Sequence, residues 1–445
     1  MIVFDLLRGA HRVRFLLMYT EIHRCRICGN SHLTTLLDLG SQALTGVFPK
    51  KKDMEVESMP IVLTKCTGED VCGLVQLKHS GAPEEMYGMN YGYRSGINQS
   101  MVKHLKGVQE QAIRMGEPKN GDIILDIGSN DATFLSFYEP NAFTLIGMDP
   151  TGVKFESYYP PHISLVKNFF SAERFQRASG NRPAKIITSI AMFYDLESPQ
   201  SFVNDIAESL ADDGIWIFEQ SYLPSMLAVN AYDTICHEHL EYYALRQIVW
   251  LLERAGMGIL DVSLNDANGG SFRVTAVKES HPKFSGHAES AKELLQREAN
   301  EGMEDLATYE AFSTQVFTHR KNLNDLLKKL HGEGKTVFGL GASTKGNVIL
   351  QFCNLTVEDV PCIAEVNEDK FGCFTPGTKI PILSQREADI KRPDYYLVMP
   401  WHFKNGIVKG MAVYLQNGGK LIFPLPELSI IDHHSSVHRE HASAA

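Results

Sequence analysis

Long apolar runs and a surplus of basic residues are both missing from this sequence of 445 residues. No stretch approaches the roughly 20 consecutive apolar residues that a membrane-spanning helix needs, so we expect no membrane partner. The formal net charge of −10 argues against DNA or RNA as a substrate. The composition, 44% hydrophobic and 22% charged, is that of a globular protein of about two to four domains.

The start of the chain also lacks the features of a targeting segment. Its apolar stretch VRFLLM is short and contains Arg14, and no small-residue cleavage site follows. We therefore expect a cytoplasmic protein with a ragged or over-extended N-terminus, in which Met1 and Met18 are both open as the start of translation.

Cysteine is scarce, and four of the eight cysteines are gathered near the start. Two residues separate Cys25 from Cys28, which is the spacing of a zinc knuckle. Five residues separate Cys66 from Cys72, a wider gap than usual, and Gly68 allows that loop to bulge. In a reducing compartment this group favours structural zinc over disulfides. The alternative is four small, partly buried thiols.

Strand-like and helix-like segments alternate in two parts of the chain. Residues 85–280 contain apolar strands that end at Asp126 and Asp149, and residues 331–432 contain a second such series. This alternation is typical of doubly wound α/β domains. The charge-rich stretch 281–330 between them is expected to be a helical linker with a solvated face.

The turn after the first strand of residues 85–280 has few glycines. A dinucleotide fingerprint needs three, as G-x-G-x-x-G, so that the backbone can approach a pyrophosphate. Here Gly128 stands alone, because Asn130 occupies the next glycine position. S-adenosylmethionine (SAM) has no pyrophosphate and needs fewer glycines, so the turn favours SAM.

A carboxylate for the ribose of SAM follows at the expected distance. Asp149 lies 21 residues after Gly128, at the end of the next strand, where it can accept both hydroxyl protons. The apolar residues that follow the third strand are placed to cover adenine. The predicted cofactor residues are Asp126, Gly128, Ser129, Asn130, Asp149, Ile190, Ala191 and Met192. The alternative is an ordinary turn with a helix-capping aspartate.

The motif His237-Glu238-His239 allows three interpretations. A zinc protease needs two histidines four residues apart on a helix, whereas these are two apart. On a strand they would share a face, so a metal site is possible, although only Glu241 is near enough to add a ligand. A solvated polar turn is the second interpretation. The third is acid–base chemistry, because an imidazole can remove a proton next to a carbonyl near neutral pH.

A glycine-rich turn opens the second α/β segment. Gly339, Gly341 and Gly346 surround Lys345 at a strand-to-helix junction, which suits a phosphate. It is not a P-loop, because the order of residues differs. Binding of a diphosphate and simple domain packing are both consistent with it, and a second SAM or NAD site is a further alternative. Arg273 suits a phosphate or carboxylate, or else a salt bridge at a strand edge.

Nine stretches occur together in the order of one known family. They are CRICG, CGLVQL, YGYRSGINQSM, LDIGSNDATFL, HEHLEYY, NGGSFRV, GLGASTKGNVILQFC, PGTKIPI and LIFPLPE. Through them the chain resembles the sugar C-methyltransferase family from Cys25 to about Pro426. The resemblance implies SAM-dependent methylation at carbon of a nucleotide-linked keto-deoxysugar, commonly a thymidine-diphosphate 4-keto-hexose.

The same resemblance implies an α/β fold of three parts. These are a small N-terminal zinc-binding module (20–84), a central class I SAM-methyltransferase Rossmann-like domain with its bridging segment (85–280) and, after the linker (281–330), a C-terminal Rossmann-like substrate-binding domain (331–432).

The resemblance also implies roles for single residues. It assigns the catalytic base to His239 and places Glu238 in the site. Members often have an aromatic residue three positions before the base, where this chain has Cys236. We therefore expect Tyr93, and after it Tyr91, to hold the enolate oxygen. Tyr242 and Tyr243 are further candidates. The predicted substrate-binding residues are Arg273, Gly341, Lys345 and Asn347.

Two other functions compete with this one. A SAM-dependent O- or N-methyltransferase of another small molecule would need no base that breaks a C–H bond. A non-enzymatic zinc and Rossmann binding protein would have no specific affinity for SAM. The partner that we expect is a nucleotide sugar, and the protein itself is expected to be a monomer or a weak homodimer.

Overall fold

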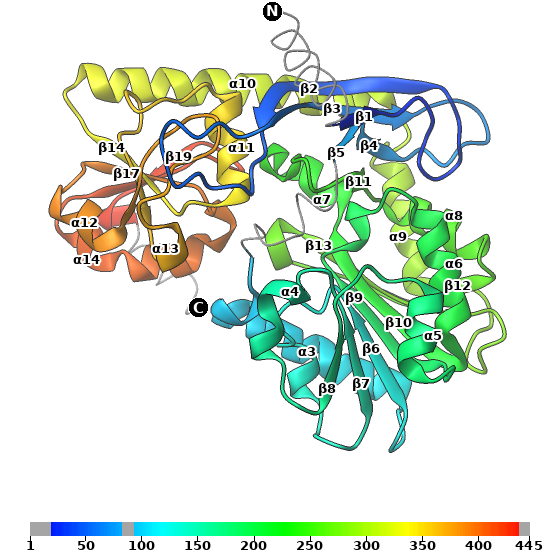
Figure 1. Ribbon diagram of the computed structural model, residues 1–445. Helices are drawn as coiled ribbons and strands as arrows, with labels where there is room; N and C mark the ends of the chain where they lie inside the picture. Colours follow the sequence, from blue (N-terminus) through cyan, green and yellow to red (C-terminus); the bar gives the residue numbers. More distant parts are fainter. Residues whose placement is uncertain (1–18, 82–92, 436–445) are drawn as a thin grey trace, which may run out of the picture. The chain divides into compact units, whose positions relative to one another are not determined.

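A computed structural model describes residues 19–81 and 93–435 (Figure 1). It contains two compact units, and the chain passes from one to the other several times. The first unit takes in residues up to Thr34, Thr64–Ser225 and Glu238–Glu304. The second takes Thr35–Leu63, Met226–His237 and the chain from Asp305 onward.

The first unit is built on a seven-stranded sheet with the strand order β12-β13-β10-β9-β6-β7-β8. Its strands are β6 (Ile123–Ile127), β7 (Thr144–Met148), β8 (Ile163–Val166), β9 (Ala184–Ile190), β10 (Leu210–Ser221), β12 (Met257–Asn265) and β13 (Ser271–Lys278). β13 runs antiparallel to both of its neighbours, whereas β8, β7, β6, β9 and β10 are parallel. This order, with its one antiparallel strand, is that of class I SAM-dependent methyltransferases, as the sequence predicts.

Both faces of this sheet are covered by helices. The central strand β6 reads IILDI and is buried throughout, because side chains on each face pack into a core. Val108 and Ala112 of α3 pack with one face, and Phe193 packs with the other face beside Trp216. The helices of this unit are α3 (Gln99–Gly116), α4 (Gly152–Phe155), α5 (Ala172–Ser179), α6 (Pro199–Ser209), α8 (Leu245–Glu253) and α9 (Glu289–Asn300), and α7 (Leu223–Ala228) spans the boundary between the units.

Short strands near the N-terminus form two small sheets. β1 (Tyr19–Glu21) pairs with β5 (His79–Gly81). A four-stranded sheet has the order β11-β4-β3-β2. Its strands are β2 (Leu33–Ala43), β3 (Ser58–Cys66), β4 (Val75–Leu77) and β11 (Glu241–Tyr242). The predicted module 20–84 therefore contributes residues to both units, because β2 and β3 each cross the unit boundary.

The second unit contains a six-stranded sheet with the order β16-β15-β14-β17-β18-β19, in which only β19 is antiparallel. Its strands are β14 (Val337–Leu340), β15 (Ile363–Glu365), β16 (Ile382–Ser384), β17 (Tyr395–Val398), β18 (Lys420–Phe423) and β19 (Ser429–Ile431). Its helices are α10 (Leu306–Gly332), α11 (Thr344–Phe352), α12 (Gln385–Ile390), α13 (Lys404–Gly410) and α14 (Ala412–Gln416). This is the strand order of a dinucleotide-type Rossmann sheet.

The helical stretch expected at 281–330 differs from the prediction in one respect. It comprises two helices, and α9 belongs to the first unit whereas α10 belongs to the second. α10 buries an apolar stripe that includes Phe312, Val316 and Leu323, so it is not a purely solvated connection.

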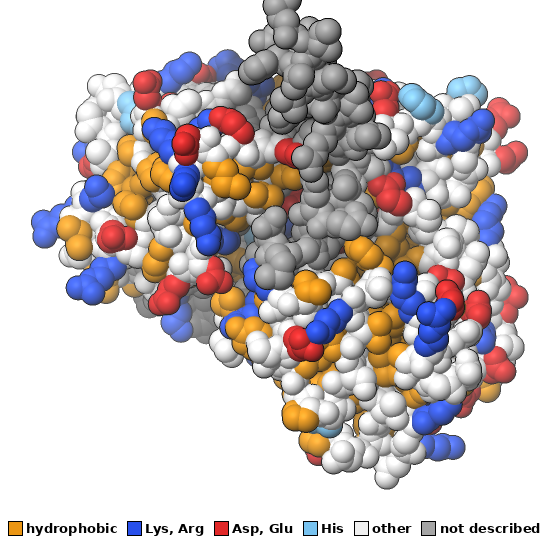
Figure 2. All heavy atoms as spheres, in the orientation of Figure 1, with side chains coloured by type: hydrophobic (Ala, Val, Ile, Leu, Met, Phe, Trp, Pro, Cys, Tyr) orange, Lys and Arg blue, Asp and Glu red, His pale blue; other side chains and the backbone are white. Residues whose placement is uncertain are grey.

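Charged side chains of both signs are spread over the visible face of the described residues (Figure 2). Among those residues, no helix combines the length and the apolar character that a membrane crossing requires.

Candidate active site and metal centre

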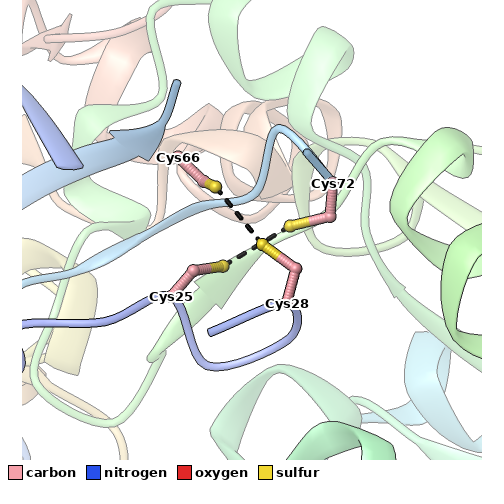
Figure 3. Close-up of side chains that lie close together, drawn as sticks. All are labelled: Cys25, Cys28, Cys66 and Cys72. Carbon is pink, nitrogen blue, oxygen red and sulfur yellow. Dashed lines mark hydrogen bonds between the residues drawn. The ribbon is translucent and has the colours of Figure 1, made fainter. Parts of the chain in front are cut away.

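The four early cysteines come together in the first unit (Figure 3). Their sulfur atoms all lie within 4.8 Å of one another, and the pairs Cys25–Cys72 and Cys28–Cys66 are 3.4 and 3.5 Å apart. Four thiolates bound at about 2.3 Å to one tetrahedral ion would be separated by nearly this distance. The donor set therefore fits zinc, as predicted, and the wide gap between Cys66 and Cys72 does not separate their thiols.

The surroundings favour a thiolate at Cys66, whereas hydrogen bonds from Cys25 and Cys66 raise the pKa of Cys72. Hydrogen bonds from Cys25 and Cys72 lower the pKa of Cys66 to about 4. The side-chain amide of Asn30 also donates to the Cys66 sulfur at 3.3 Å. Such hydrogen bonds orient the ligands of a metal site.

The predicted cofactor turn lies at the carboxyl end of β6. Gly128 has φ +74°, and a Cβ added there would lie 3.2 Å from Cγ of Met192. Glycine is thus required both by the backbone and by the approach of Met192. Ser129 is held by Tyr159, whose hydroxyl is 2.8 Å from the serine oxygen.

Two buried carboxylates hold this turn. The backbone N–H of Asn130 donates to Asp149 Oδ2 at 2.7 Å, and that of Thr151 donates to Oδ1 at 2.6 Å. Asp126 accepts a hydrogen bond of 2.6 Å from Thr188. Burial raises the pKa of Asp126 to about 7, and the charge of Asp149 adds to the shift. Burial raises the pKa of Asp149 as well.

The loop Ile190–Met192 leaves the carboxyl end of β9, the strand beside β6. All three of its residues are partly exposed, and Ala191 is fixed by an N–H···O bond of 2.7 Å to Glu219. The ends of β6, β7 and β9 thus carry all the predicted cofactor residues at one edge of the sheet, at the point where the strand order reverses. Ligands of open α/β sheets bind at that point, so these residues fit SAM.

The chain passes from the second unit to the first within the motif His237-Glu238-His239. His237 belongs to the second unit, where it is 1% exposed and its Nε2 is 3.1 Å from the Met59 carbonyl oxygen. Glu238 and His239 belong to the first unit and are partly exposed. The two histidines therefore have different environments, and only the second is available to a substrate.

Sequence reasoning missed a tyrosine beside His239. The ring of Tyr194 lies 4.3 Å from the His239 ring, and the Leu240 N–H donates to the Tyr194 carbonyl at 2.8 Å. Tyr194 belongs to the short helix η4 (Phe193–Asp195), which follows Met192 directly. The contact places His239 at the same edge of the sheet as the cofactor turn. Tyr194 could have been found from the sequence, because it directly follows the stretch SIAMF that we predicted to cover adenine.

The tyrosines predicted to hold the enolate oxygen differ in exposure. Tyr93 is 46% exposed, and its carbonyl accepts a 3.2 Å hydrogen bond from Asn130 of the cofactor turn. Tyr91 lies outside the described residues. Tyr242 and Tyr243 are buried, and Tyr243 stacks on Phe193 in the core.

Arg273 is engaged with an acidic partner on the neighbouring strand. Its guanidinium donates to Glu219 at 2.7 and 2.8 Å and to Gln111 at 2.8 Å. His104 of α3 lies 2.5 Å from the other oxygen of Glu219. Burial would raise the pKa of Glu219, but the hydrogen bond from His104 and the charge of Arg273 outweigh burial and lower it. The sequence left a strand-edge salt bridge as an alternative; the structure has the salt bridge, but β13 is paired on both sides, so it lies inside the sheet.

The glycine-rich turn of the second unit lies at the carboxyl end of β14. Gly341 has φ +83°, and an added Cβ would lie 2.7 Å from Pro400. Glu365 accepts from the Ala342 N–H at 2.7 Å, much as Asp149 does in the first unit. Lys345 is partly exposed at the start of α11, whereas the amide of buried Asn347 donates to the Thr45 carbonyl at 2.7 Å.

Three family models match the chain one after another. A "Putative zinc binding domain" matches residues 25–87, a "Methyltransferase domain" matches 103–262, and a "C-methyltransferase C-terminal domain" matches 266–426. C-methyltransferase NovU of Streptomyces niveus is 28% identical over 421 residues, which are 94% of this chain and 98% of NovU.

Two solved structures are similar to part of the chain. The CurJ carbon methyltransferase has 15% identity and a TM-score of 0.31, over 41% of this chain and 56% of that chain. An S-adenosylmethionine-dependent methyltransferase from Clostridium acetobutylicum has 12% identity and a TM-score of 0.31, over 40% of this chain and 92% of that chain.

Proposed function

Since the chain belongs to the C-methyltransferases that join a zinc-binding domain, a methyltransferase domain and a C-methyltransferase C-terminal domain, we propose that it methylates a nucleotide-activated keto-deoxysugar. The protein is a SAM-dependent methyltransferase whose acceptor atom is carbon. The proposed acceptor is the carbon next to the ketone of a thymidine-diphosphate 4-keto-hexose or a close analogue.

The contact between His239 and Tyr194 carries this proposal. A methyl acceptor at carbon needs a base, whereas many oxygen and nitrogen acceptors do not. His239 is partly exposed, and its neighbour Tyr194 follows the loop that leaves β9 at the cofactor edge. An imidazole at this edge is suited to remove a proton from a substrate that lies beside the cofactor.

In the proposed mechanism His239 takes the proton from the carbon next to the ketone, and Glu238 stabilises the imidazolium that forms. Asp126, Gly128 and Asp149 would hold SAM, and Ile190–Met192 would cover its adenine. When bound, SAM supplies an electrophilic methyl group to the enolate carbon. A tyrosine hydroxyl donates to the enolate oxygen, which needs such a donor while it carries charge.

Three tyrosines are candidates for that hydroxyl. Tyr93 and Tyr91 are proposed from the sequence, and Tyr194 is added because its ring touches that of His239. We further propose that Gly341 and Lys345 bind the diphosphate of the substrate. Arg273 and Asn347, which the sequence predicted to bind substrate, are proposed instead as supporting residues, because their side chains are already hydrogen-bonded to Glu219 and to the Thr45 carbonyl.

The test is mass spectrometry of the protein with SAM and a panel of nucleotide 4-keto-deoxysugars in deuterated water. We expect a methyl gain located on carbon, together with deuterium uptake at the same carbon. Replacement His239→Asn should lower both by about 10²- to 10⁴-fold, the usual contribution of a general base, with SAM affinity unchanged.

Replacement His23→Asn, at an exposed histidine away from the motif, is the matched control and should behave as the wild type. Retained methylation by the His239→Asn variant would refute the base assignment. Methylation at oxygen or nitrogen, with no carbon-bound deuterium, would refute the proposed reaction.

A further inference from the structure

Arg26 is a buried arginine inside the zinc knuckle. It lies between the metal ligands Cys25 and Cys28, yet its side chain is only 2% exposed. The guanidinium donates to the Leu77 carbonyl at 2.6 Å and to the Ser80 hydroxyl at 2.7 Å. A buried charge needs compensating hydrogen bonds or opposite charges, so these partners fix the position of the Arg26 guanidinium.

Two carboxylates face Arg26. Its Nε is 3.7 Å from Glu241 Oε1 and 3.5 Å from Glu197 Oε2. The Glu241 side chain is fully buried, whereas that of Glu197 is 43% exposed. Burial raises the pKa of Glu241 well above its usual range, and the charge of Arg26 opposes that shift. The two side chains are therefore coupled: the Arg26 charge favours the ionised form of Glu241, and the Glu241 carboxyl is one of several oxygen neighbours of the guanidinium.

Backbone pairing joins the same two segments. Glu241 of β11 lies opposite Gln76 of β4, and the Leu77 N–H donates to the Leu240 carbonyl at 2.8 Å. Gln76 also accepts from the Arg26 N–H at 3.1 Å. The chain segment that follows His239 is thus attached to the four-cysteine module, while its Leu240 N–H is attached to Tyr194.

We propose that Arg26 and Glu241 are positioning residues for His239, through which the four-cysteine module fixes the strand that begins two residues after the base. This inference rests on the proposed function and adds a role for the zinc module in it. The module holds the imidazole at the cofactor edge and contributes no group to the reaction. Misplacement of a catalytic group by about 1 Å can cost roughly 10²-fold in rate. Loss of the interaction between Arg26 and Glu241 should therefore lower kcat.

Two variants test the interaction between Arg26 and Glu241, one at each residue. Arg26→Met removes the charge and keeps most of the side-chain volume, and Glu241→Gln replaces the carboxyl that faces Arg26 without touching the knuckle. The matched controls are Arg24→Met, at an exposed arginine of the same loop, and Glu197→Gln, at the exposed carboxylate that also faces Arg26. Zinc content, SAM affinity, kcat and amide hydrogen exchange in the peptide 238–243 are measured for each.

We expect both test variants to keep their zinc and their SAM affinity. Their kcat should fall by about tenfold or more, and exchange of the Leu240–Tyr243 amides should quicken by about tenfold. The controls should match the wild type. Unchanged exchange and kcat in Glu241→Gln, or an equal effect in Glu197→Gln, would overturn the proposal.

The exchange measurement separates this inference from the proposed function. If the wild type methylates no sugar of the panel, the proposed function fails, and exchange in 238–243 still decides whether the interaction between Arg26 and Glu241 fixes this segment. If Arg26→Met loses zinc, Glu241→Gln gives the answer, because its substitution lies outside the cysteine loops.

Discussion

Two carboxylates of the proposed cofactor site are buried at a cost in folding stability. Asp126 and Asp149 are both 4% exposed and lie at the ends of neighbouring strands, so each carboxylate is partly desolvated beside a like charge. Under the proposed function this desolvation is accepted because SAM needs the two carboxylates. The same desolvation makes the stability of the protein depend on pH.

We expect Asp126→Asn to stabilise the protein more at pH 8 than at pH 4. In the wild type the pKa of Asp126 is about 7 when folded and near 3.8 when unfolded. Between these values the folded state binds more protons, so stability is lost as the pH rises through this window and the loss is complete above pH 7. One pKa unit corresponds to about 1.4 kcal/mol.

The measurement is the free energy of unfolding in urea from pH 4 to pH 8. The difference between Asp126→Asn and the wild type should grow by a few kcal/mol across that range. Asp266→Asn, at an exposed aspartate, is the control and should give a constant difference. A constant difference for Asp126→Asn would mean that its carboxyl is not desolvated.

At the scale of elements, the sequence carries enough local signal for the strands but not for contacts between them. The cofactor turn could be predicted because a buried run of five residues, IILDI, leads into a glycine. The Tyr194–His239 contact could not, since 45 residues separate its members and only packing of η4 against the motif joins them. Arg26 and Glu241 are still farther apart in the chain, and no pattern links them.

The helical stretch shows the same limit. Charge-rich helical periodicity in 281–330 predicted helix correctly, but the assignment of α9 and α10 to different units depends on which core each apolar stripe joins. The motif at His237–His239 is similar, because its two histidines look equivalent in the sequence and their burial separates them.

The turn after β6 gives a prediction at this scale. Gly128→Ala should weaken SAM binding by about tenfold or more, because its Cβ would push on Met192, which we propose to lie against the adenine. Alanine at positive φ should in addition cost roughly 1–2 kcal/mol of folding stability. Gly121→Ala is the matched control, since Gly121 has φ +86° with nothing within 4 Å of an added Cβ.

Calorimetric titration of both variants with SAM distinguishes the backbone strain of alanine at positive φ, which both variants share, from the contact of the added Cβ with Met192, which only Gly128→Ala has. Both should lose some stability, and only Gly128→Ala should lose SAM affinity. Equal affinity in the two variants would show that the turn does not approach the cofactor.

At the scale of the whole molecule, the two largest sheets of the described residues share one construction. In each unit a glycine with positive φ follows the first strand of the sheet, and a carboxylate at the end of the next strand accepts a backbone N–H of that turn, Asp149 from Asn130 and Glu365 from Ala342. The glycines are followed by different chemistry, however. The first turn presents Asn130 and Asp131, and the second presents Ser343 and Lys345. A neutral or cationic ligand suits the first turn, and an anionic ligand suits the second.

We therefore expect SAM and thymidine diphosphate to protect different units from hydrogen exchange. A ligand at a hundred times its Kd adds about 2.7 kcal/mol to the stability of the state that binds it. Amides of β6 and β9 that exchange by unfolding of the first unit should slow by roughly 100-fold with SAM. Those of β14 and β17 should slow with the nucleotide, and inorganic phosphate at the same concentration is the control. Protection of the first unit alone by both ligands would contradict a diphosphate site at Gly341 and Lys345, and it would move the nucleotide of the substrate to the methyltransferase sheet.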